Sequence, residues 1–387
     1  MTVLDDLAGW QRDLRVQFPM IVDHPDVAYL DSAATSQKPQ AVLDAVITYL
    51  TTGNANASRG AYPWANHTTA AVERAAGRLR RFLRDPGPER STVQFVSGAT
   101  EGLRAVARDW LVPRLRPGDE ILVPFADHNA NTLPWVEAAE LAGVAVRAIP
   151  YDSAHDYDHR RLTVGPRTRL IAATHVHHVY GGDMNVQRLR ALAPDVPICL
   201  DAAQSFGHIP IDLSTLDVDF VVFSGHKAMA LPGTGAVWAR NARGPAYHPA
   251  GWIGSPNTSG IISLAAAMRW LDEAGLDRIA DWNRALGVRL TEGLSKMPAY
   301  EILGCPRSLT ADSAVQQRHG IVAFRHHAIG SNDLGFILAA DGLLVRADDH
   351  CQGAQGEKTA SVRVSVHVYN TPAEIDRLLE VLATLDH

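Results

Sequence analysis

The sequence predicts an α/β fold, with a mostly parallel, doubly wound sheet in a large domain and a smaller α+β domain after it. Three observations predict this fold. Short, uniformly apolar runs alternate with helical segments over most of the chain, as in strands that helices cover on both faces. Polar residues follow these runs directly, at the sheet edge where such folds bind ligands. The alternation ends after about Pro256, where a second unit is expected to begin.

The elements of the large domain follow in order along the chain. A first strand at 93–96 leads through a Gly/Ser/Thr turn into a helix that reaches about Trp110. A second helix is expected at 133–142. Runs too short for helices favour strands, and they occur at 120–124, 144–149, 169–173, 198–200 and 220–223.

Two helical stretches are expected in the C-terminal part. A long helix should run from about 261 to 276 and continue toward Leu294. The last helix should begin after Thr371, a good N-cap, with Pro372 in the first turn and Glu374 completing a capping box.

The expected domain division follows from these elements. Residues 21–265 form the large α/β domain and residues 266–387 form the small α+β domain, onto which residues 1–20 pack. The chain has 387 residues, 46% of them hydrophobic, which is enough to bury two cores.

Composition argues against several classes of function. A net charge of −6 and a pI near 6.3 provide no basic surface for nucleic acid or anionic membranes. No apolar run approaches the roughly 20 residues of a membrane span, and the acidic N-terminus is unlike a signal peptide. Three cysteines without zinc-finger spacing predict a reducing, cytoplasmic location and no metal site.

The segment from Asp219 to Gly235 carries the strongest functional signal. Its apolar run ends in Ser224, His226 and Lys227, before a Gly/Pro-rich turn. Lysine is scarce, with four against 32 arginines, so this chain has little general reason to place one at a buried strand end. A desolvated lysine amine loses its proton and condenses with aldehydes, which is how proteins hold pyridoxal 5'-phosphate (PLP). An ordinary strand-end lysine is the alternative.

Other strand ends carry side chains that PLP requires. The turn 97–100 would offer amide groups at a helix N-terminus to the phosphate. Asp201 would keep the pyridine nitrogen protonated, with a helix N-cap as the alternative. His128 would stack on the ring, although a loop histidine without function fits the same position. Ser224 and His226 would add phosphate contacts.

These motifs, in this order, resemble the class V, fold-type I PLP enzymes, and most closely the group II (Suf-type) cysteine desulfurases. The resemblance extends from about Val27 to Asp376, nearly the whole chain, and the motif set is highly specific for the superfamily. The matching motifs are Val27–Pro39, Ser97–Glu101, His128–Trp135, Asp201–Gln204, Ser224–Lys227, Ser255–Ile262 and Tyr369–Asp376.

The resemblance implies a role for each site residue. Lys227 is implied to be the Schiff-base lysine and the acid/base that moves the substrate's Cα proton. Asp201 would pair with the pyridine nitrogen, Gln204 with the ring hydroxyl, and His128 would stack on the ring. The implied phosphate contacts are Ala99, Thr100, Ser224, His226 and, from the second subunit of a homodimer, Ser255. The implied substrate contacts are Arg363, which grips the carboxylate, His178 and Arg346.

The segment Val345–Cys351 is similar to the family segment whose cysteine takes sulfur from the substrate, with the same spacing from Arg346 to Cys351. Such a cysteine must be accessible and partly thiolate, so Arg346 and His350 would help, and the acidic pair at 348–349 would oppose them. An inert thiol is the alternative here, and it is the expectation for Cys199 and Cys305.

Three departures from the family pattern stand near these residues. The family usually has Gly-His-His before the cysteine, where this chain has Asp349-His350 after Asp348. The family's Ser-Asn facing the substrate is His177-His178 here, which adds a titratable ring. The segment 239–254 is shorter than the family's hairpin, which would leave a persulfide less covered or admit a larger substrate.

The resemblance implies a homodimeric, PLP-dependent cysteine desulfurase that converts L-cysteine into alanine and a persulfide on Cys351, with a protein as one candidate sulfur acceptor. The nearest alternative is a PLP-dependent C–S lyase that forms pyruvate and ammonia by β-elimination from cysteine or a conjugate. The changed residues before Cys351 and the pair His177-His178 favour that alternative. An aminotransferase or epimerase would not need Cys351. From a different class, a catalytically silent PLP-fold subunit could bind a sulfur carrier.

Overall fold

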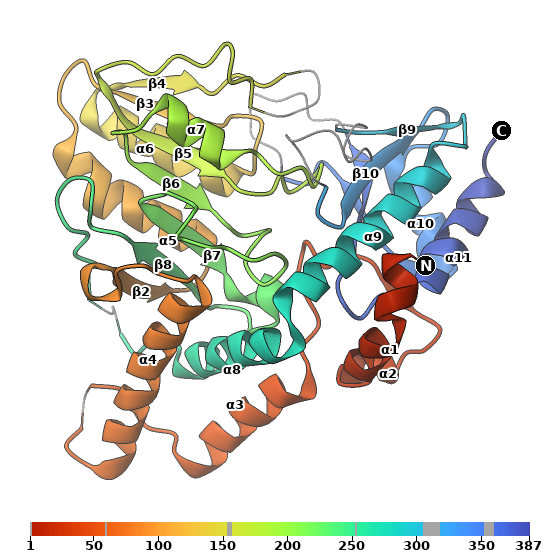
Figure 1. Cartoon of the computed structure of the whole chain (residues 1–387), viewed down its shortest axis with the longest axis horizontal. Coiled ribbons are helices and arrows are strands. Elements are labelled where there is room, and N and C mark those ends of the chain that lie inside the picture. The colour runs from red at the N-terminus through yellow and green to blue at the C-terminus, as the bar shows by residue number, and fades with distance from the viewer. Residues whose placement is uncertain (1, 59, 153–156, 252–253, 305–317, 352–359) are drawn as a thin grey trace.

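The structure is a computed structural model that describes residues 2–58, 60–152, 157–251, 254–304, 318–351 and 360–387. Figure 1 shows a large sheet with its covering helices and a smaller C-terminal sheet, joined by α8 (Thr258–Ala274) and α9 (Leu276–Leu294). Both chain ends lie beside the smaller sheet.

The large sheet has seven strands in the order β2-β8-β7-β6-β5-β3-β4. All neighbours are parallel except at β8, which is antiparallel to both β2 and β7. The mostly parallel α/β sheet predicted from the sequence is therefore confirmed, whereas β8 was not expected. The strands are β2 (Thr92–Val96), β3 (Glu120–Val123), β4 (Ala145–Ala148), β5 (Thr168–Thr174), β6 (Ile198–Asp201), β7 (Phe220–Ser224) and β8 (Gly235–Ala239).

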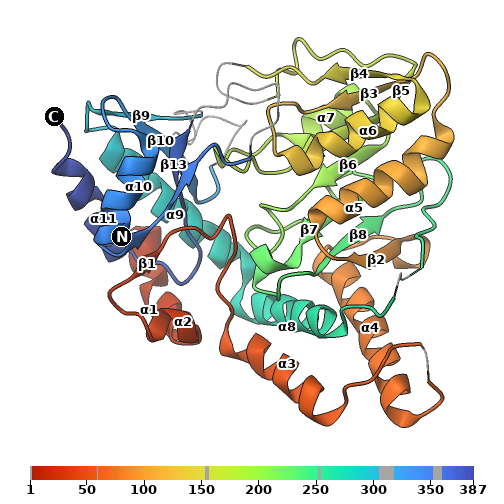
Figure 2. The ribbon, with the colours of Figure 1, turned by 180° about the vertical axis from the view of Figure 1, so that it is seen from behind.

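Helices cover both faces of this sheet. Figure 2 shows α5 (Ala99–Ala105) and α6 (Leu133–Ala142) on one face, whereas α7 (Val186–Leu192) lies on the face turned forward in Figure 1. A π-helical turn, Val106–Leu111, continues α5. In β7, Val221 and Phe223 pack with the core on the α7 and α8 side, and Phe220 and Val222 pack with the core on the α5 and α6 side. Burial on both faces explains why the strands are uniformly apolar.

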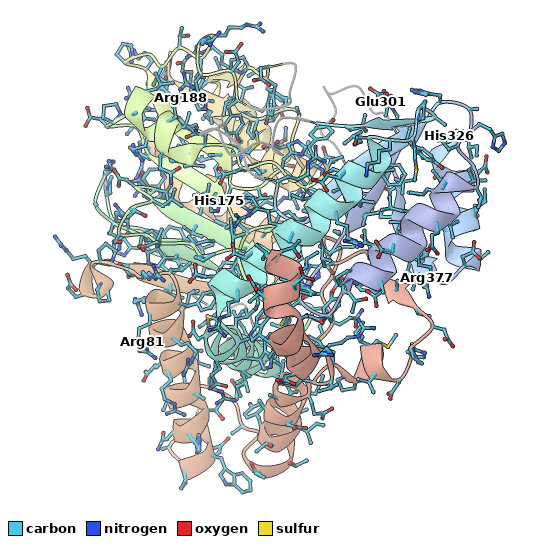
Figure 3. All side chains as sticks on the ribbon, turned by 45° about the vertical axis from the view of Figure 1, so that its right-hand side comes forward. Arg81, His175, Arg188, Glu301, His326 and Arg377 are labelled. Atoms are coloured by element: carbon cyan, nitrogen blue, oxygen red, sulfur yellow. The ribbon has the colours of Figure 1, made fainter. Side chains whose placement is uncertain are left out.

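The smaller sheet is antiparallel, with the order β12-β13-β10-β9. Figure 3 labels Glu301 and His326, which lie on its edge strand β9 and on the neighbouring strand β10. Its core is shared with α9, α10 and α11. These elements are β9 (Tyr300–Ile302), β10 (Ile321–His326), α10 (Ser331–Ala340), β12 (Arg346–Asp348), β13 (Ser361–Ser365) and α11 (Pro372–Ala383).

The N-terminal segment contacts both parts of the molecule. The helix α1 (Val3–Arg15) packs along α9, and β1 (Ala28–Tyr29) pairs in parallel with β11 (Leu343–Leu344). Figures 1 and 2 show α3 (Gln40–Thr52) and α4 (Pro63–Phe82) projecting away from the large sheet, and a short α2 (Pro19–Val22) follows α1. The division at residue 265 stays a prediction.

Two helix-end predictions have different outcomes. The capping box is present, because the Thr371 hydroxyl accepts the Glu374 N–H and the Glu374 carboxylate accepts the Thr371 N–H. The single long helix predicted to continue toward Leu294 is wrong. Gly275 adopts φ 89° between α8 and α9, a conformation that suits glycine and ends the first helix. In the described ranges, no helix is both long and apolar enough to cross a membrane.

Candidate active site

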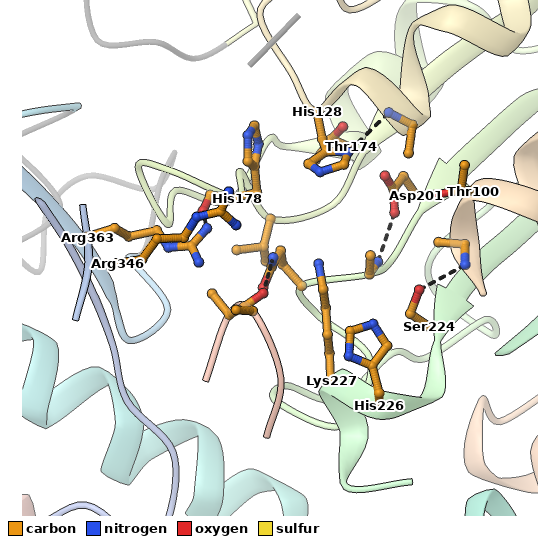
Figure 4. A pocket seen from close by; sticks show the side chains of 17 residues that line it. Thr100, His128, Thr174, His178, Asp201, Ser224, His226, Lys227, Arg346 and Arg363 are labelled. Atoms are coloured by element: carbon orange, nitrogen blue, oxygen red, sulfur yellow. Dashed lines mark hydrogen bonds between the residues drawn. The ribbon is translucent and has the colours of Figure 1, made fainter. Parts of the chain in front are cut away.

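A cavity of about 260 Å³ opens at the carboxyl ends of β5, β6 and β7 and reaches the small sheet. Figure 4 shows side chains from both parts of the molecule converging on it. The cavity brings together most of the residues that the sequence predicted. They are Ala99, Thr100, His128, His178, Asp201, Gln204, Ser224, His226, Lys227, Arg346 and Arg363.

Lys227 lies in the 3-10 turn Gly225–Ala228 that follows β7, and its side chain points into the cavity (Figure 4). The His208 ring donates from Nε2 to the Lys227 carbonyl at 2.9 Å, which holds the backbone of this turn. Burial lowers the pKa of Lys227 to about 8. The carboxylate of Asp201 opposes this shift and the guanidinium of Arg363 adds to it. The amine is therefore partly neutral near physiological pH.

This pKa predicts how the cofactor-free protein captures an aldehyde. Only the neutral amine attacks a carbonyl, and the neutral form gains population as the pH rises through the pKa. The rate of Schiff-base formation with added PLP should therefore rise with pH around 8, and not around the 10.5 of an unperturbed lysine. Stopped-flow absorbance from about pH 6 to about 11 measures this rate. A midpoint near 10.5 would contradict the buried environment of Lys227.

Asp201 ends β6 and is buried, with its Oδ1 accepting the Ala203 N–H at 2.9 Å. Burial raises the pKa of Asp201, while the Ala203 amide and the Lys227 charge oppose that rise. A desolvated carboxyl of this kind gains stability from a cationic partner in the cavity. A protonated pyridine nitrogen is such a partner.

His128 follows β3 and faces Asp201 across the cavity (Figure 4). Its Nδ1 accepts the Ala130 N–H at 3.0 Å, so Nε2 carries the proton of the neutral ring. Burial and the positive charge of Lys227 lower the pKa of His128 to about 4. A neutral ring in this place can stack on an aromatic ligand.

The phosphate end of the predicted site is built around Ser224. Its hydroxyl accepts the Ala99 N–H at 2.8 Å, which leaves the hydroxyl proton for another acceptor. Thr100 and His226 line the same cavity. The backbones approach closely here, because a Cβ on Gly235 would lie 2.3 Å from the Phe223 carbonyl oxygen. Only glycine permits this contact, which keeps the first residue of β8 against the end of β7.

Gln204 provides the clearest test of whether PLP fits. Its Nε2 donates to the Ala33 carbonyl at 3.0 Å, which fixes the orientation of the amide. Its Oε1 is buried and has no hydrogen-bond partner among the described residues. A buried acceptor without a partner is costly and indicates a donor from a ligand, such as a ring hydroxyl. Together with the amine, carboxyl, stacking and hydroxyl groups around it, the cavity fits PLP.

Two arginines reach the cavity from neighbouring strands of the small sheet. Arg363 of β13 is almost fully buried and donates to the Asp31 carboxylate at 3.0 Å and to the His178 carbonyl at 3.1 Å. Arg346 of β12 donates from Nε to both oxygens of Asp348 at 2.9 Å. Both guanidinium groups line the cavity, as a site for a substrate carboxylate requires.

Cys351 is exposed and stands at the rim, outside the residues that line the cavity. Its Sγ lies 3.3 Å from Nη2 of Arg346, which does line the cavity. Its carbonyl accepts the Asn129 N–H at 3.2 Å, next to His128. The thiol therefore has the access and the neighbouring positive charge that reactive cysteines need.

The expectation that His350 supplies positive charge to Cys351 is wrong. The His350 ring is fully buried, with Nδ1 3.0 Å from the Asp348 carboxylate and Nε2 2.8 Å from the Ser361 hydroxyl. Burial and the charge of Arg363 lower the pKa of His350 to about 4, so the ring is neutral at physiological pH. Of the two residues expected to place positive charge beside Cys351, only Arg346 does so.

Ser255 does not lie at the cavity of its own chain. It lines a separate depression before α8, where its hydroxyl accepts from Asn56 at 3.1 Å. Its predicted contact with the phosphate of a second subunit stays a prediction. Cys199 is buried in β6, where burial raises the pKa of its thiol, and Cys305 lies outside the described residues.

A buried polar layer behind the cavity was missed from the sequence. Asp127 accepts hydrogen bonds from Tyr157 and Thr174 and lies 3.2 Å from Nε2 of His177. Burial raises the pKa of Asp127 to about 7. The expectation that both histidines of His177-His178 face the substrate is therefore wrong for His177, which points to Asp127. The position of Asp127, directly before His128, was the available signal.

In the described ranges, no group of three or more histidine, cysteine or acidic side chains is arranged to bind a metal.

The profile of the family described as Aminotransferase class-V matches residues 28–378. Cysteine desulfurase CsdA of Escherichia coli K12 is 30% identical over 95% of this chain and 96% of that protein. A cysteine desulfurase of Cronobacter sakazakii is 33% identical, again over 95% of this chain and 96% of the relative.

Solved structures of cysteine desulfurases are also similar to this chain over nearly its whole length. The apo structure of cysteine desulfurase from Thermococcus onnurineus NA1 superposes with a TM-score of 0.86 at 27% identity, covering 97% of this chain and 98% of that one. The crystal structure of CsdA from Escherichia coli, in an S-sulfonic acid form, has a TM-score of 0.83 at 29% identity, with the same coverage.

Proposed function

The chain belongs to the Aminotransferase class-V family, and from that membership we propose that it is a PLP-dependent cysteine desulfurase acting on L-cysteine. One observation carries the proposal: the Cys351 thiol lies 3.3 Å from Arg346 at the rim of the cavity that holds Lys227 and Asp201. The relatives named cysteine desulfurase, which match 95% of the chain, support it.

PLP would be held by the residues that fit it. Lys227 would bind the aldehyde, Asp201 the pyridine nitrogen and Gln204 the ring hydroxyl, with His128 against the ring. The phosphate would be held by Ala99, Thr100, Ser224 and His226. Bound PLP supplies an electron sink that makes the substrate's Cα–H acidic.

The protein's own groups perform the remaining tasks. Arg363 binds the substrate carboxylate in a buried place where its charge is little screened. Lys227, with a pKa of about 8, takes the Cα proton and can return a proton later. The Cys351 thiolate attacks the substrate sulfur. The bond from that sulfur to Cβ breaks with its electron pair left on the carbon skeleton, and a sulfur–sulfur bond forms. The skeleton takes up one proton at Cβ, regains one at Cα and leaves as alanine.

The persulfide then needs an acceptor thiol. The exposed position of Cys351 suits transfer to a second molecule, and an acceptor protein is part of the proposal. A homodimer that shares Ser255 between sites and a cytoplasmic location also belong to it. The dimer rests on the family resemblance, and the location rests on the reduced state that three cysteines predict.

A C–S lyase is the second candidate. It is favoured by His178, because a histidine in the cavity wall places a titratable ring beside the substrate site, where the resemblance implies an amide side chain. In that reaction Cys351 takes no part, and cysteine yields pyruvate, ammonia and hydrogen sulfide.

Product analysis separates the two. Purified holoenzyme with L-cysteine and a thiol reductant should release alanine, with pyruvate at most a minor product. Both compounds are measured in one sample by amino-acid analysis and a coupled dehydrogenase assay. Pyruvate as the main product would replace the desulfurase with the lyase.

A further inference from the structure

His178 contacts three parts of the candidate site. Its ring Nε2 lies 3.0 Å from the His350 carbonyl, and its own carbonyl accepts from Arg363 at 3.1 Å. Its ring edge meets His128, with the ring centres 5.1 Å apart and the planes at 82°. Figure 4 shows His178 on the same side of the cavity as Arg363 and Arg346.

The hydrogen bonds determine which nitrogen of His178 carries the proton. A carbonyl can only accept, so Nε2 must donate to His350. Burial, and after it the neighbouring His177, His128 and Arg363, lower the pKa of His178 well below its usual value, so the ring is neutral. Its Nδ1 is buried and has no partner among the described residues.

The plane of the His178 ring is also held from behind. His177 stacks on it with ring centres 5.0 Å apart and planes at 22°. The His177 ring is itself fixed, because its Nδ1 accepts the Val179 N–H at 3.1 Å and its Nε2 faces Asp127 at 3.2 Å. His177 and Asp127 therefore fix the orientation of the His178 ring, so that its Nε2–H points to the His350 carbonyl.

The turn that receives this hydrogen bond carries Cys351. His350 and Cys351 have φ values of 54° and 57°, which side-chain-bearing residues rarely adopt. Such a conformation persists only when surrounding contacts hold it. Two of those contacts come from the cavity side: the His178 ring to the His350 carbonyl, and the Asn129 N–H to the Cys351 carbonyl.

We propose that His178 is a positioning residue for sulfur transfer: through its Nε2–H to the His350 carbonyl, it holds the His350–Cys351 turn so that the thiol stays beside Arg346 at the cavity rim. This role rests on the proposed function, since positioning Cys351 matters for turnover only where Cys351 takes the sulfur. It also gives a structural task to one of the residues that depart from the family pattern.

The test compares two substitutions in the holoenzyme. His178→Phe keeps an aromatic ring for stacking but has no donor, whereas the Nε2 amide of His178→Gln can reach the position of the histidine Nε2. For His178→Phe we expect hydrogen exchange at the amides of Asn129 and Cys351 to accelerate about five- to tenfold. The kcat for alanine should fall about 10- to 100-fold, with KM for cysteine nearly unchanged and the pyruvate share increased. His178→Gln should restore most of the slow exchange at these two amides and most of the kcat for alanine.

His326 provides a matched control. Its Nε2 donates to the Leu385 carbonyl at 3.0 Å, the same kind of bond, and it lies on the small sheet away from His175 and the large sheet (Figure 3). His326→Phe should leave exchange at Asn129 and the ratio of alanine to pyruvate unchanged. If His178→Phe folds poorly, His178→Asn replaces it, because its amide is one methylene too short to reach the His350 carbonyl.

Two outcomes would overturn the role of His178. One is wild-type exchange at Asn129 and Cys351 in His178→Phe or His178→Asn. The other is a His178→Gln protein as impaired as His178→Phe, which would show that the donor is unimportant. A wild-type enzyme that makes pyruvate would instead refute the proposed function, and amide exchange would still report whether His178 holds the turn.

Discussion

Lys227→Ala is expected to abolish both the yellow colour of the purified holoenzyme and its turnover. The side chain is the lysine amine that lines the cavity, and burial together with nearby charges sets its pKa at about 8. Without it, no covalent bond to the cofactor forms and the Cα proton has no base. Loss of a covalent and acid/base group together should reduce kcat by at least about a thousandfold. Absorbance spectra and alanine formation measure the two effects.

Lys38 offers a matched control for this substitution. Burial lowers its pKa to about 8 as well, but its Nζ donates to the Ser36 carbonyl and it does not line the cavity. Lys38→Ala should therefore keep the cofactor absorbance. If Lys38→Ala lost the cofactor absorbance and Lys227→Ala kept it, the assignment of the Schiff base to Lys227 would be wrong.

Cys351→Ser should remove alanine formation while leaving cofactor binding intact. A serine hydroxyl keeps the size of the side chain but is a far weaker nucleophile toward sulfur than a thiolate. We expect alanine formation to fall by at least about a thousandfold. The cofactor absorbance should remain, because Cys351 stands at the rim and not among the lining residues.

The buried cysteine of β6 is the control for Cys351. Cys199 is enclosed in the sheet, and burial raises the pKa of its thiol. Cys199→Ala should make alanine at close to the wild-type rate. A Cys351→Ser enzyme with full alanine turnover would exclude a persulfide on Cys351 as a step of the reaction.

The sequence predicted the large sheet well because each strand carries its own local signal. Runs such as 220–223 are apolar on both faces, and the polar residues that follow them must meet at one edge of a parallel sheet. For the same reason Asp201, Ser224 and Lys227 were predicted together and are found in one cavity. The resemblance to class V enzymes is confirmed by the family match.

What the sequence could not provide depends on contacts between distant segments. The orientations of His177 and His350 are set by Asp127, Asp348 and Ser361, and no spacing along the chain reveals those directions. The break at Gly275 was missed because apolar periodicity continues across it, and a single left-handed residue decides the path. The hydrogen bond from His178 to His350 joins residues 172 positions apart, which only the folded chain brings together.

Mass spectrometry of the enzyme after a single turnover provides the decisive result. Holoenzyme mixed with one equivalent of L-cysteine, without reductant, should gain the mass of one sulfur atom on the peptide that contains Cys351, and one alanine should appear for each modified chain. An unmodified Cys351 after cysteine has been consumed, or sulfur attached to Cys199 or Cys305 instead, would contradict sulfur transfer at this site.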